Sequence, residues 1–141
     1  MIRTLLKREE SYAVHALINI AENPGTHAAQ IAEDLDMPPA FMAKVLRKLV
    51  TAGLVDSKTG RKGGVTLKVD PARVSLLDVL EAVSGVVMMD DCQAVPRCAT
   101  QRRKGHCKLR LAWQNTSQAV REVLANVTLS ELCDDVPRAQ F

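Results

Sequence analysis

Hydrophobic residues in the first part of the chain recur at the spacing of an amphipathic helix in two successive segments. Residues 7–22 carry one apolar face, formed by Ala13, Val14, Leu17, Ile18 and Ala21. This periodicity predicts a helix that ends at the turn sequence ENPG. Residues 26–36 predict a second helix of about three turns with Thr26 as its N-cap; its apolar positions are Ala28, Ile31, Ala32 and Leu35.

A third helical segment has two faces of different character. Pro38 and Pro39 end the second helix and suit the first turn of a third, and Gly53 suits the position just after its end. The apolar face consists of Met42, Val45, Leu46 and Leu49. The opposite face repeats at the same spacing and consists of Ala40, Ala43, Lys44 and Arg47. The pattern therefore predicts two short helices joined by a tight turn, the second with a small, basic outer surface.

After the third segment the period changes from that of a helix to that of a strand. Residues 54–55 and 65–69 predict two short strands. The glycine-rich sequence SKTGRKGG between them predicts a hairpin tip with three basic side chains, Lys58, Arg61 and Lys62. Three helices followed by a basic hairpin is the order of a winged helix-turn-helix. We therefore expect a mainly α fold with a small β-hairpin wing.

The second half of the chain predicts two more helices around a cysteine-rich loop. Ser75 and Asp78 form the S-x-x-D start signal of a helix that reaches about Ser84. After residues 86–107, an apolar face continues for about five turns; it consists of Leu109, Ala112, Trp113, Thr116, Val120, Val123, Leu124 and Val127. A short helical turn at TLSELCDD and a frayed end follow. The expected units are a winged helix-turn-helix domain (1–85), a cysteine-rich loop (86–107) and a long helix with a tail (108–141).

Composition narrows the class of protein. The 141 residues are 47% hydrophobic and 25% charged, which suits a globular domain with an appended helix. The sequence has no signal-peptide pattern and no apolar run long enough for a membrane span. We therefore expect a cytoplasmic protein without a membrane partner, in which thiols stay reduced. No nucleophile–base pattern, phosphate-binding loop or carboxylate pair indicates an enzyme.

The small, basic face of the third helix is compatible with binding to duplex DNA. An α-helix fits the major groove, Ala40 and Ala43 allow a close approach of the backbone, and Lys44 and Arg47 can reach phosphate or guanine. The basic hairpin tip can contact backbone phosphates. The same residues are also compatible with a solvated surface or a protein-binding adaptor. The long apolar stripe suggests a two-fold dimer, which would suit a pseudo-palindromic site.

The chain resembles the IscR/NsrR/CymR family of winged helix-turn-helix transcriptional regulators, also written Rrf-two. Three stretches carry the resemblance: SYAVHALINIA, IAEDLDMPPAFMAKVLRKLVTAGLVDSKTGRKGGVTL and VSLLDVLEAVSG. The resemblance extends over nearly the whole chain, because the second half also has a three-cysteine loop, a tryptophan in the long helix and TLSEL at the end of that helix. The resemblance implies a homodimeric regulator, taken as a repressor, that binds double-stranded DNA and dimerises through the long helix.

The resemblance also implies which residues contact DNA. The helix from about Pro39 to Thr51 would enter the major groove, and the hairpin tip from Lys58 to Gly64 would contact the minor groove and the backbone. The positions carried over are Pro39, Ala40, Ala43, Lys44, Arg47, Lys58, Thr59, Arg61, Lys62 and Gly63. Ala43 and Thr59 stand where one branch of the family has glutamate and arginine, which indicates a different DNA target.

The loop contains three cysteines, Cys92, Cys98 and Cys107, among basic residues. Clustered thiols in a reducing compartment indicate metal binding or redox sensing. A zinc site with a histidine and a metal-free thiol switch between Cys92 and Cys98 are both compatible with these residues. The resemblance implies an iron–sulfur cluster, [2Fe-2S] or [4Fe-4S], at the three cysteines. Its loss, oxidation or nitrosylation would change DNA affinity, so the loop would sense redox, iron–sulfur status or nitric oxide.

Three thiolates are one fewer than the usual four ligands of an iron–sulfur cluster. By resemblance, the fourth ligand would be His15 or Glu10 in the first helix, from this chain or a partner subunit; His15 is equally compatible with an ordinary packed or surface histidine. His106 directly precedes Cys107, which makes joint ligation of one iron awkward. The eight residues between Cys98 and Cys107 are a longer gap than the family usually has. Cys133 lies outside the loop, and we expect it only to pack.

Overall fold

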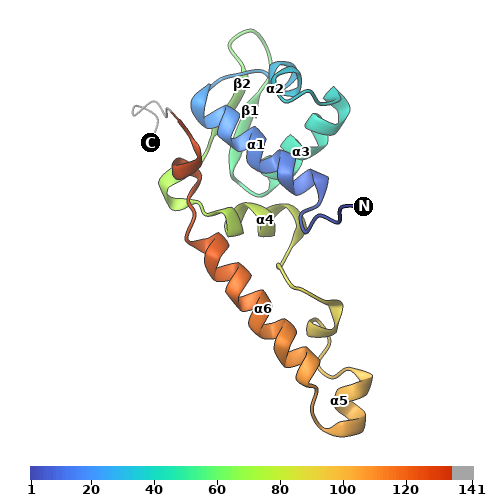
Figure 1. Ribbon diagram of the computed structural model, residues 1–141. Coiled ribbons are helices and arrows are strands. Elements are labelled where there is room, and N and C mark those ends of the chain that lie inside the picture. The colour runs from blue at the N-terminus through green and yellow to red at the C-terminus, as the bar shows by residue number, and fades with distance from the viewer. Residues whose placement is uncertain (135–141) are drawn as a thin grey trace.

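The computed structural model describes residues 1–134 and consists of helices and one β-hairpin (Figure 1). The helices are α1 (Arg8–Glu22), α2 (Ala28–Asp34), α3 (Pro39–Thr51), α4 (Leu76–Ser84), α5 (Ala99–Lys104) and α6 (Lys108–Ala125), with 3-10 turns η1 (Pro71–Arg73), η2 (Asp91–Gln93) and η3 (Leu129–Leu132). Strands β1 (Val55–Lys58) and β2 (Gly64–Leu67) are antiparallel. The predicted winged helix-turn-helix architecture is confirmed. The predicted fraying at the chain end lies outside the described residues.

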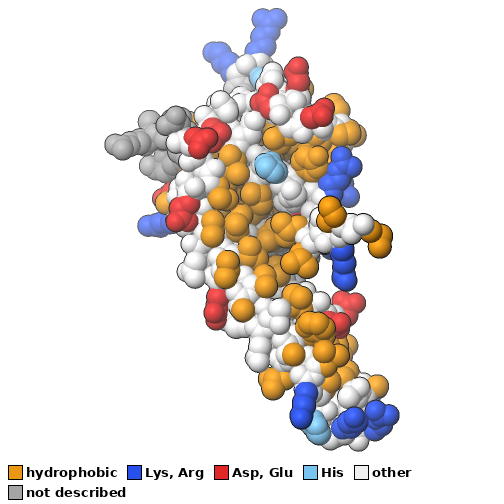
Figure 2. Space-filling view, in the orientation of Figure 1, with side chains coloured by type: hydrophobic (Ala, Val, Ile, Leu, Met, Phe, Trp, Pro, Cys, Tyr) orange, Lys and Arg blue, Asp and Glu red, His pale blue; other side chains and the backbone are white. Residues whose placement is uncertain are grey.

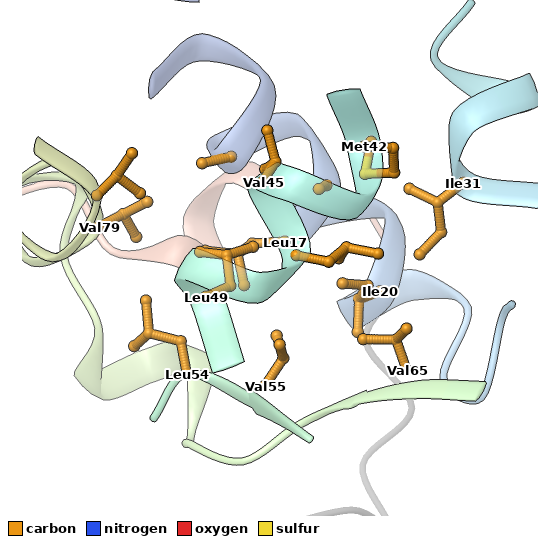
Figure 3. Packing of buried hydrophobic residues seen from close by; sticks show 14 of the residues in the cluster. Leu17, Ile20, Ile31, Met42, Val45, Leu49, Leu54, Val55, Val65 and Val79 are labelled. Carbon is orange, nitrogen blue, oxygen red and sulfur yellow. The ribbon is translucent and has the colours of Figure 1, made fainter. Parts of the chain in front are cut away.

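The hydrophobic core lies between α1, α3 and the hairpin (Figure 3). Leu17 of α1, Leu49 of α3 and Val65 of β2 are all buried there. Ile31 of α2 and Leu129 of η3 belong to the same cluster. Because the predicted apolar face of α3 is buried in this core, the helix must turn its small, basic face outward.

The hairpin is attached to the turn between α1 and α2 by backbone contacts. The Gly25 N–H donates to the Val65 carbonyl, and the Val65 N–H donates to the Thr26 carbonyl, both at 2.9 Å. Gly64 has a φ of 122°, and a side-chain carbon there would collide with the Gly25 carbonyl. Only glycine combines this backbone angle with so close an approach, so Gly64 determines where the wing sits.

The boundaries of three elements differ from those predicted. Thr26 is not the N-cap of α2: His27 takes that position, because the Thr26 backbone is paired with Val65 and its hydroxyl donates to the Asn23 carbonyl. Strand β1 runs to Lys58, which shortens the hairpin tip to residues 59–63. The segment 86–107 is not a continuous loop, because it contains η2 and α5.

Helix α6 extends away from the body formed by α1 to α4 and the hairpin (Figure 1). Ser117 is the only buried residue that the structure describes in this 18-residue helix. Leu109, Leu111 and Val123 are exposed, the last by 66%. Figure 2 shows hydrophobic side chains along this arm as well as on the body. Four of the eight residues of the predicted apolar stripe are exposed and none is buried, so the chain covers this stripe only in part.

Replacing Gly64 with alanine should destabilise the domain by about 2–4 kcal/mol, because the new methyl group collides with the Gly25 backbone at a strained φ. Urea unfolding followed by circular dichroism measures this change. Gly60→Ala is the matched control, since Gly60 also has a positive φ but meets no atom within 4 Å. An equal loss in both variants would contradict a special role for the contact with Gly25.

Candidate DNA-binding surface and three-cysteine pocket

The outer face of α3 carries five of the residues predicted to contact DNA, and all five are exposed: Pro39, Ala40, Ala43, Lys44 and Arg47. The helix begins at Pro39, as the sequence predicted, with Pro38 as its N-cap. Two small side chains beside two long basic ones leave the backbone of this face accessible. This is the shape and charge that a helix needs to enter a major groove.

The hairpin tip and the adjoining end of β1, Lys58, carry the other predicted contacts. Lys58, Thr59, Arg61 and Lys62 are exposed, and Gly63 is half-buried. A side-chain carbon at Gly63 would collide with the Lys58 carbonyl, so the turn requires glycine at this position. Basic side chains also project from the wing end of the molecule in Figure 2. The contacts of these residues with DNA stay predictions.

An ion-pair cluster that was not predicted from the sequence joins α1 to the basic side of α3. Glu9 Oε1 of α1 lies 2.9 Å from Lys48 Nζ and 3.7 Å from Lys44 Nζ. Lys48 Nζ also donates to the Val83 carbonyl of α4 at 3.4 Å. The hydrogen bond from Lys48 is the main cause that lowers the pKa of the Glu9 carboxyl. Lys44 therefore has a carboxylate partner, whereas Arg47 has none among the ion pairs of the described residues.

The three loop cysteines line one pocket of about 280 Å³ at the far end of the arm. Cys92 lies in η2, Cys98 is the N-cap of α5, and Cys107 is the N-cap of α6. The other lining residues are Asp90, Ala99, Thr100, Leu109, Arg110 and Trp113. The two helical turns within the segment 86–107 thus bring together thiols that are up to 15 positions apart in the sequence.

The N-termini of the two helices create different environments for these thiols. The backbone N–H groups of Gln101 and Thr100 in α5 hold the pKa of the Cys98 thiol below its usual value. The Cys107 sulfur accepts a hydrogen bond from the Arg110 N–H at 3.4 Å. Partial burial, followed by the neighbouring Asp90, raises the pKa of the Cys92 thiol. Cys98 therefore forms a thiolate more readily than Cys92.

A small polar network anchors η2 on the middle of α6. The Ser117 hydroxyl donates to Gln93 Oε1 at 2.9 Å and accepts from the Met89 N–H at 2.9 Å. Gln93 Oε1 also accepts from the N–H groups of Met89 and Asp90, at 3.0 and 3.2 Å. Ser117 is 4% exposed. Neither Gln93 nor Ser117 was predicted from the sequence, because their hydrogen bond joins residues 24 positions apart.

The candidate fourth ligands from α1 do not reach the three-cysteine pocket within one chain. Glu10 Oε2 accepts a hydrogen bond from the Lys7 N–H at 2.8 Å. Glu10 lines a second pocket, which Asp90 also borders but none of the three cysteines does. His15 is exposed and borders another pocket, with residues 4–8. His106 borders the pocket next to Cys107, with its Nδ1 3.1 Å from the Lys104 carbonyl. No group of three or more His, Cys, Asp or Glu residues in the described chain could hold a metal ion.

Two further sequence predictions concern Cys133 and the absence of a membrane-spanning helix. Cys133 packs against the core, as predicted, and its thiol donates to the Leu129 carbonyl at 3.2 Å. None of the helices within residues 1–134 has the length and hydropathy needed to cross a bilayer.

The fold, with its exposed basic helix and wing, defines the protein as a winged helix-turn-helix protein. The model of the Rrf2 family, described as an iron-dependent transcriptional regulator, matches residues 6–135. The chain therefore belongs to the Rrf2 family and is a transcriptional regulator, as the resemblance in its sequence predicted.

Individual relatives agree with this assignment. The HTH-type transcriptional regulator IscR of Vibrio vulnificus (strain YJ016) is 31% identical over 127 residues, which cover 88% of this chain and 74% of that protein. Protein aau3 of Rhizobium meliloti (strain 1021) is 28% identical over 138 residues, which cover 96% of this chain and 89% of the relative. These similarities extend over the body and most of the arm.

Solved structures support the fold over the same length. CymR, the global cysteine regulator of B. subtilis, has a TM-score of 0.71 at 23% identity, covering 94% of this chain and 96% of that one. IscR of T. potens has a TM-score of 0.73 at 22% identity, covering 96% and 90%. The printed names of IscR from Vibrio vulnificus and of CymR describe regulators.

In metal-free protein, Cys98 should react with iodoacetamide faster than Cys92 at neutral pH, because its pKa is lowered and that of Cys92 is raised. Quenched labelling followed by peptide mass spectrometry gives the rate at each thiol as a function of pH. The labelling rate of Cys98 should reach its plateau at lower pH. Faster labelling of Cys92 would contradict the environments described above.

Proposed function

We propose that this regulator is a homodimer that represses transcription by binding a pseudo-palindromic promoter site. Its affinity for DNA would respond to an iron–sulfur cluster bound by Cys92, Cys98 and Cys107. Through this cluster it would sense redox, iron–sulfur status or nitric oxide. The observation that carries the proposal is the single pocket lined by all three thiols. Thiolates are the ligands that iron–sulfur clusters require.

The pocket suits a cluster better than a single ion. Its volume of about 280 Å³ leaves room for more than one metal ion, and its lining among the described residues includes three thiols and no histidine. A zinc site with a histidine ligand would need that residue from outside this lining. Backbone N–H groups at the N-terminus of α5 and the nearby Arg110 favour the thiolate form of Cys98.

A metal-free thiol switch is the second candidate function. Cys92 and Cys98 line the same pocket, and their pKa values are shifted in opposite directions. A low-pKa thiolate beside a second thiol is the arrangement in which oxidation gives a disulfide. An oxidant would accept the two electrons released when the sulfur–sulfur bond forms. Elemental analysis of the purified protein separates this candidate from the cluster and from zinc.

Protein purified without oxygen should be coloured and should contain both iron and acid-labile sulfide. Cys98→Ala should abolish the visible absorption and leave the far-ultraviolet circular dichroism unchanged, because Cys98 lies outside the hydrophobic core. Cys133→Ala is the matched control and should keep the chromophore. A colourless wild-type protein with stoichiometric zinc, or without metal, would contradict the cluster.

Binding to duplex promoter DNA should weaken steeply as salt concentration rises, because lysine and arginine contacts release counterions. Arg47→Ala should lower the affinity about 10-fold and reduce the salt slope by about one. Arg73→Ala in η1, away from α3, is the control that removes the same charge without this effect. Fluorescence anisotropy measures both. An affinity that does not respond to salt or to Arg47→Ala would contradict the placement of DNA on α3.

The proposed dimer would bury the uncovered stripe of α6. Val123→Asp should convert the dimer to a monomer, because the charge is exposed in the single chain but would be buried between two copies. Asn115→Asp, on the polar side of the same helix, is the matched control and should stay dimeric. Sedimentation velocity distinguishes the two states. A dimeric Val123→Asp protein would place the interface elsewhere.

A further inference from the structure

The three-cysteine pocket contains one more group that can ligate iron. Among the described residues that line it, Asp90 is the only acidic one, and there is no histidine. Three thiolates leave one ligand position of a cluster unfilled. We infer that the Asp90 carboxylate fills this position, an inference that rests on the cluster proposed above.

The position of Asp90 is fixed by the turn that carries Cys92. Asp90 is the N-cap of η2, and its Oδ1 accepts the Cys92 N–H at 2.8 Å. The Asp90 and Cys92 side chains line the same pocket. A carboxylate has two oxygens and about four acceptor sites. It can therefore cap η2 through one oxygen and ligate iron through the other.

The anchoring of η2 also orients Asp90. The Asp90 N–H donates to Gln93 Oε1 at 3.2 Å, and Gln93 is in turn bound by the buried Ser117 of α6. Hydrogen bonds of this kind hold a ligand in one orientation before the metal binds. Asp90 thus has a ligand-capable side chain, a place on the pocket wall and a fixed backbone.

The alternative ligands lie elsewhere in the chain. Glu10 is engaged in capping α1, His15 is exposed on α1, and the Nδ1 atom of His106 faces the Lys104 carbonyl in a neighbouring pocket. Figure 1 shows α1 in the body and α5 at the far end of the arm. Of these candidates, only Asp90 lines the three-cysteine pocket among the described residues.

An oxygen ligand gives this site a particular chemistry. A carboxylate oxygen is a hard ligand and a thiolate sulfur is a soft one. Iron–sulfur clusters prefer the soft thiolate. The iron bound by Asp90 should therefore differ from the thiolate-bound iron and should be the first to leave. Loss of that iron would alter the cluster next to η2, which is itself anchored on α6.

Three substitutions of Asp90 distinguish its role as an iron ligand from its role as the N-cap of η2. Asp90→Asn keeps an N-cap acceptor but removes the anionic ligand, Asp90→Ala removes both, and Asp90→Cys supplies a thiolate. Each variant is reconstituted without oxygen as the full-length chain. Iron, sulfide and the visible and electron paramagnetic resonance spectra are recorded, and iron release to a chelator is timed. Asp91→Asn is the matched control, because Asp91 is the neighbouring carboxylate but does not line the three-cysteine pocket.

We expect Asp90→Asn and Asp90→Ala to release iron at least 10-fold faster than wild type. Asp90→Cys should keep the cluster and show a changed spectrum, and Asp91→Asn should match wild type. If Asp90→Asn kept the wild-type spectrum and release rate, Asp90 would be only a cap and the inference would be overturned. Loss of the cluster in Glu10→Ala or His15→Ala, with Asp90→Asn unaffected, would also overturn it. A wild-type protein that takes up no cluster would overturn the proposed function as well.

Discussion

The structure depends on one constraint: α6 cannot bury its own apolar stripe. Only Ser117 of this helix is buried among the residues the structure describes, and Leu109, Leu111 and Val123 are left exposed. Burial of such a surface is the main favourable term in protein association, and a two-fold dimer provides it with one type of interface. The proposed dimer would set the separation of the two α3 helices. It would also place each three-cysteine pocket on the arm that sets this separation.

Polar contacts join the arm to the body through α4. Arg121 of α6 forms an ion pair with Glu81 of α4, and Lys48 of α3 donates to the Val83 carbonyl of the same helix. Ser117 and Gln93 anchor η2 on α6. Under the proposed function, a change in the shape of the cysteine segment would be transmitted to α3 through these contacts. Coupling arises if the two occupancy states of the pocket favour different arrangements of these contacts.

Periodicity was sufficient to predict the body. The two faces of α3, the Ser75–Asp78 capping box and the hairpin all follow from local sequence, and all were found. The arm was less predictable, because α5 has only six residues and no apolar period. The Glu9–Lys48 pair and the Gln93–Ser117 network join distant residues, so no local pattern reveals them. The turn at Asp90 has a local signal in the sequence, since residues 90–93 form a D-x-x-Q capping box that contains the first loop cysteine.

The central claim is that occupancy of the three-cysteine pocket changes how tightly α3 and the wing hold DNA. The most direct test is to titrate one promoter duplex with the same preparation, cluster-loaded and then stripped of iron by a chelator, at constant salt and dimer concentration. The account predicts that the two dissociation constants differ by at least about 10-fold, which corresponds to a coupling free energy of about 1.4 kcal/mol. Equal dissociation constants, with iron and sulfide assays confirming the two states, would contradict it.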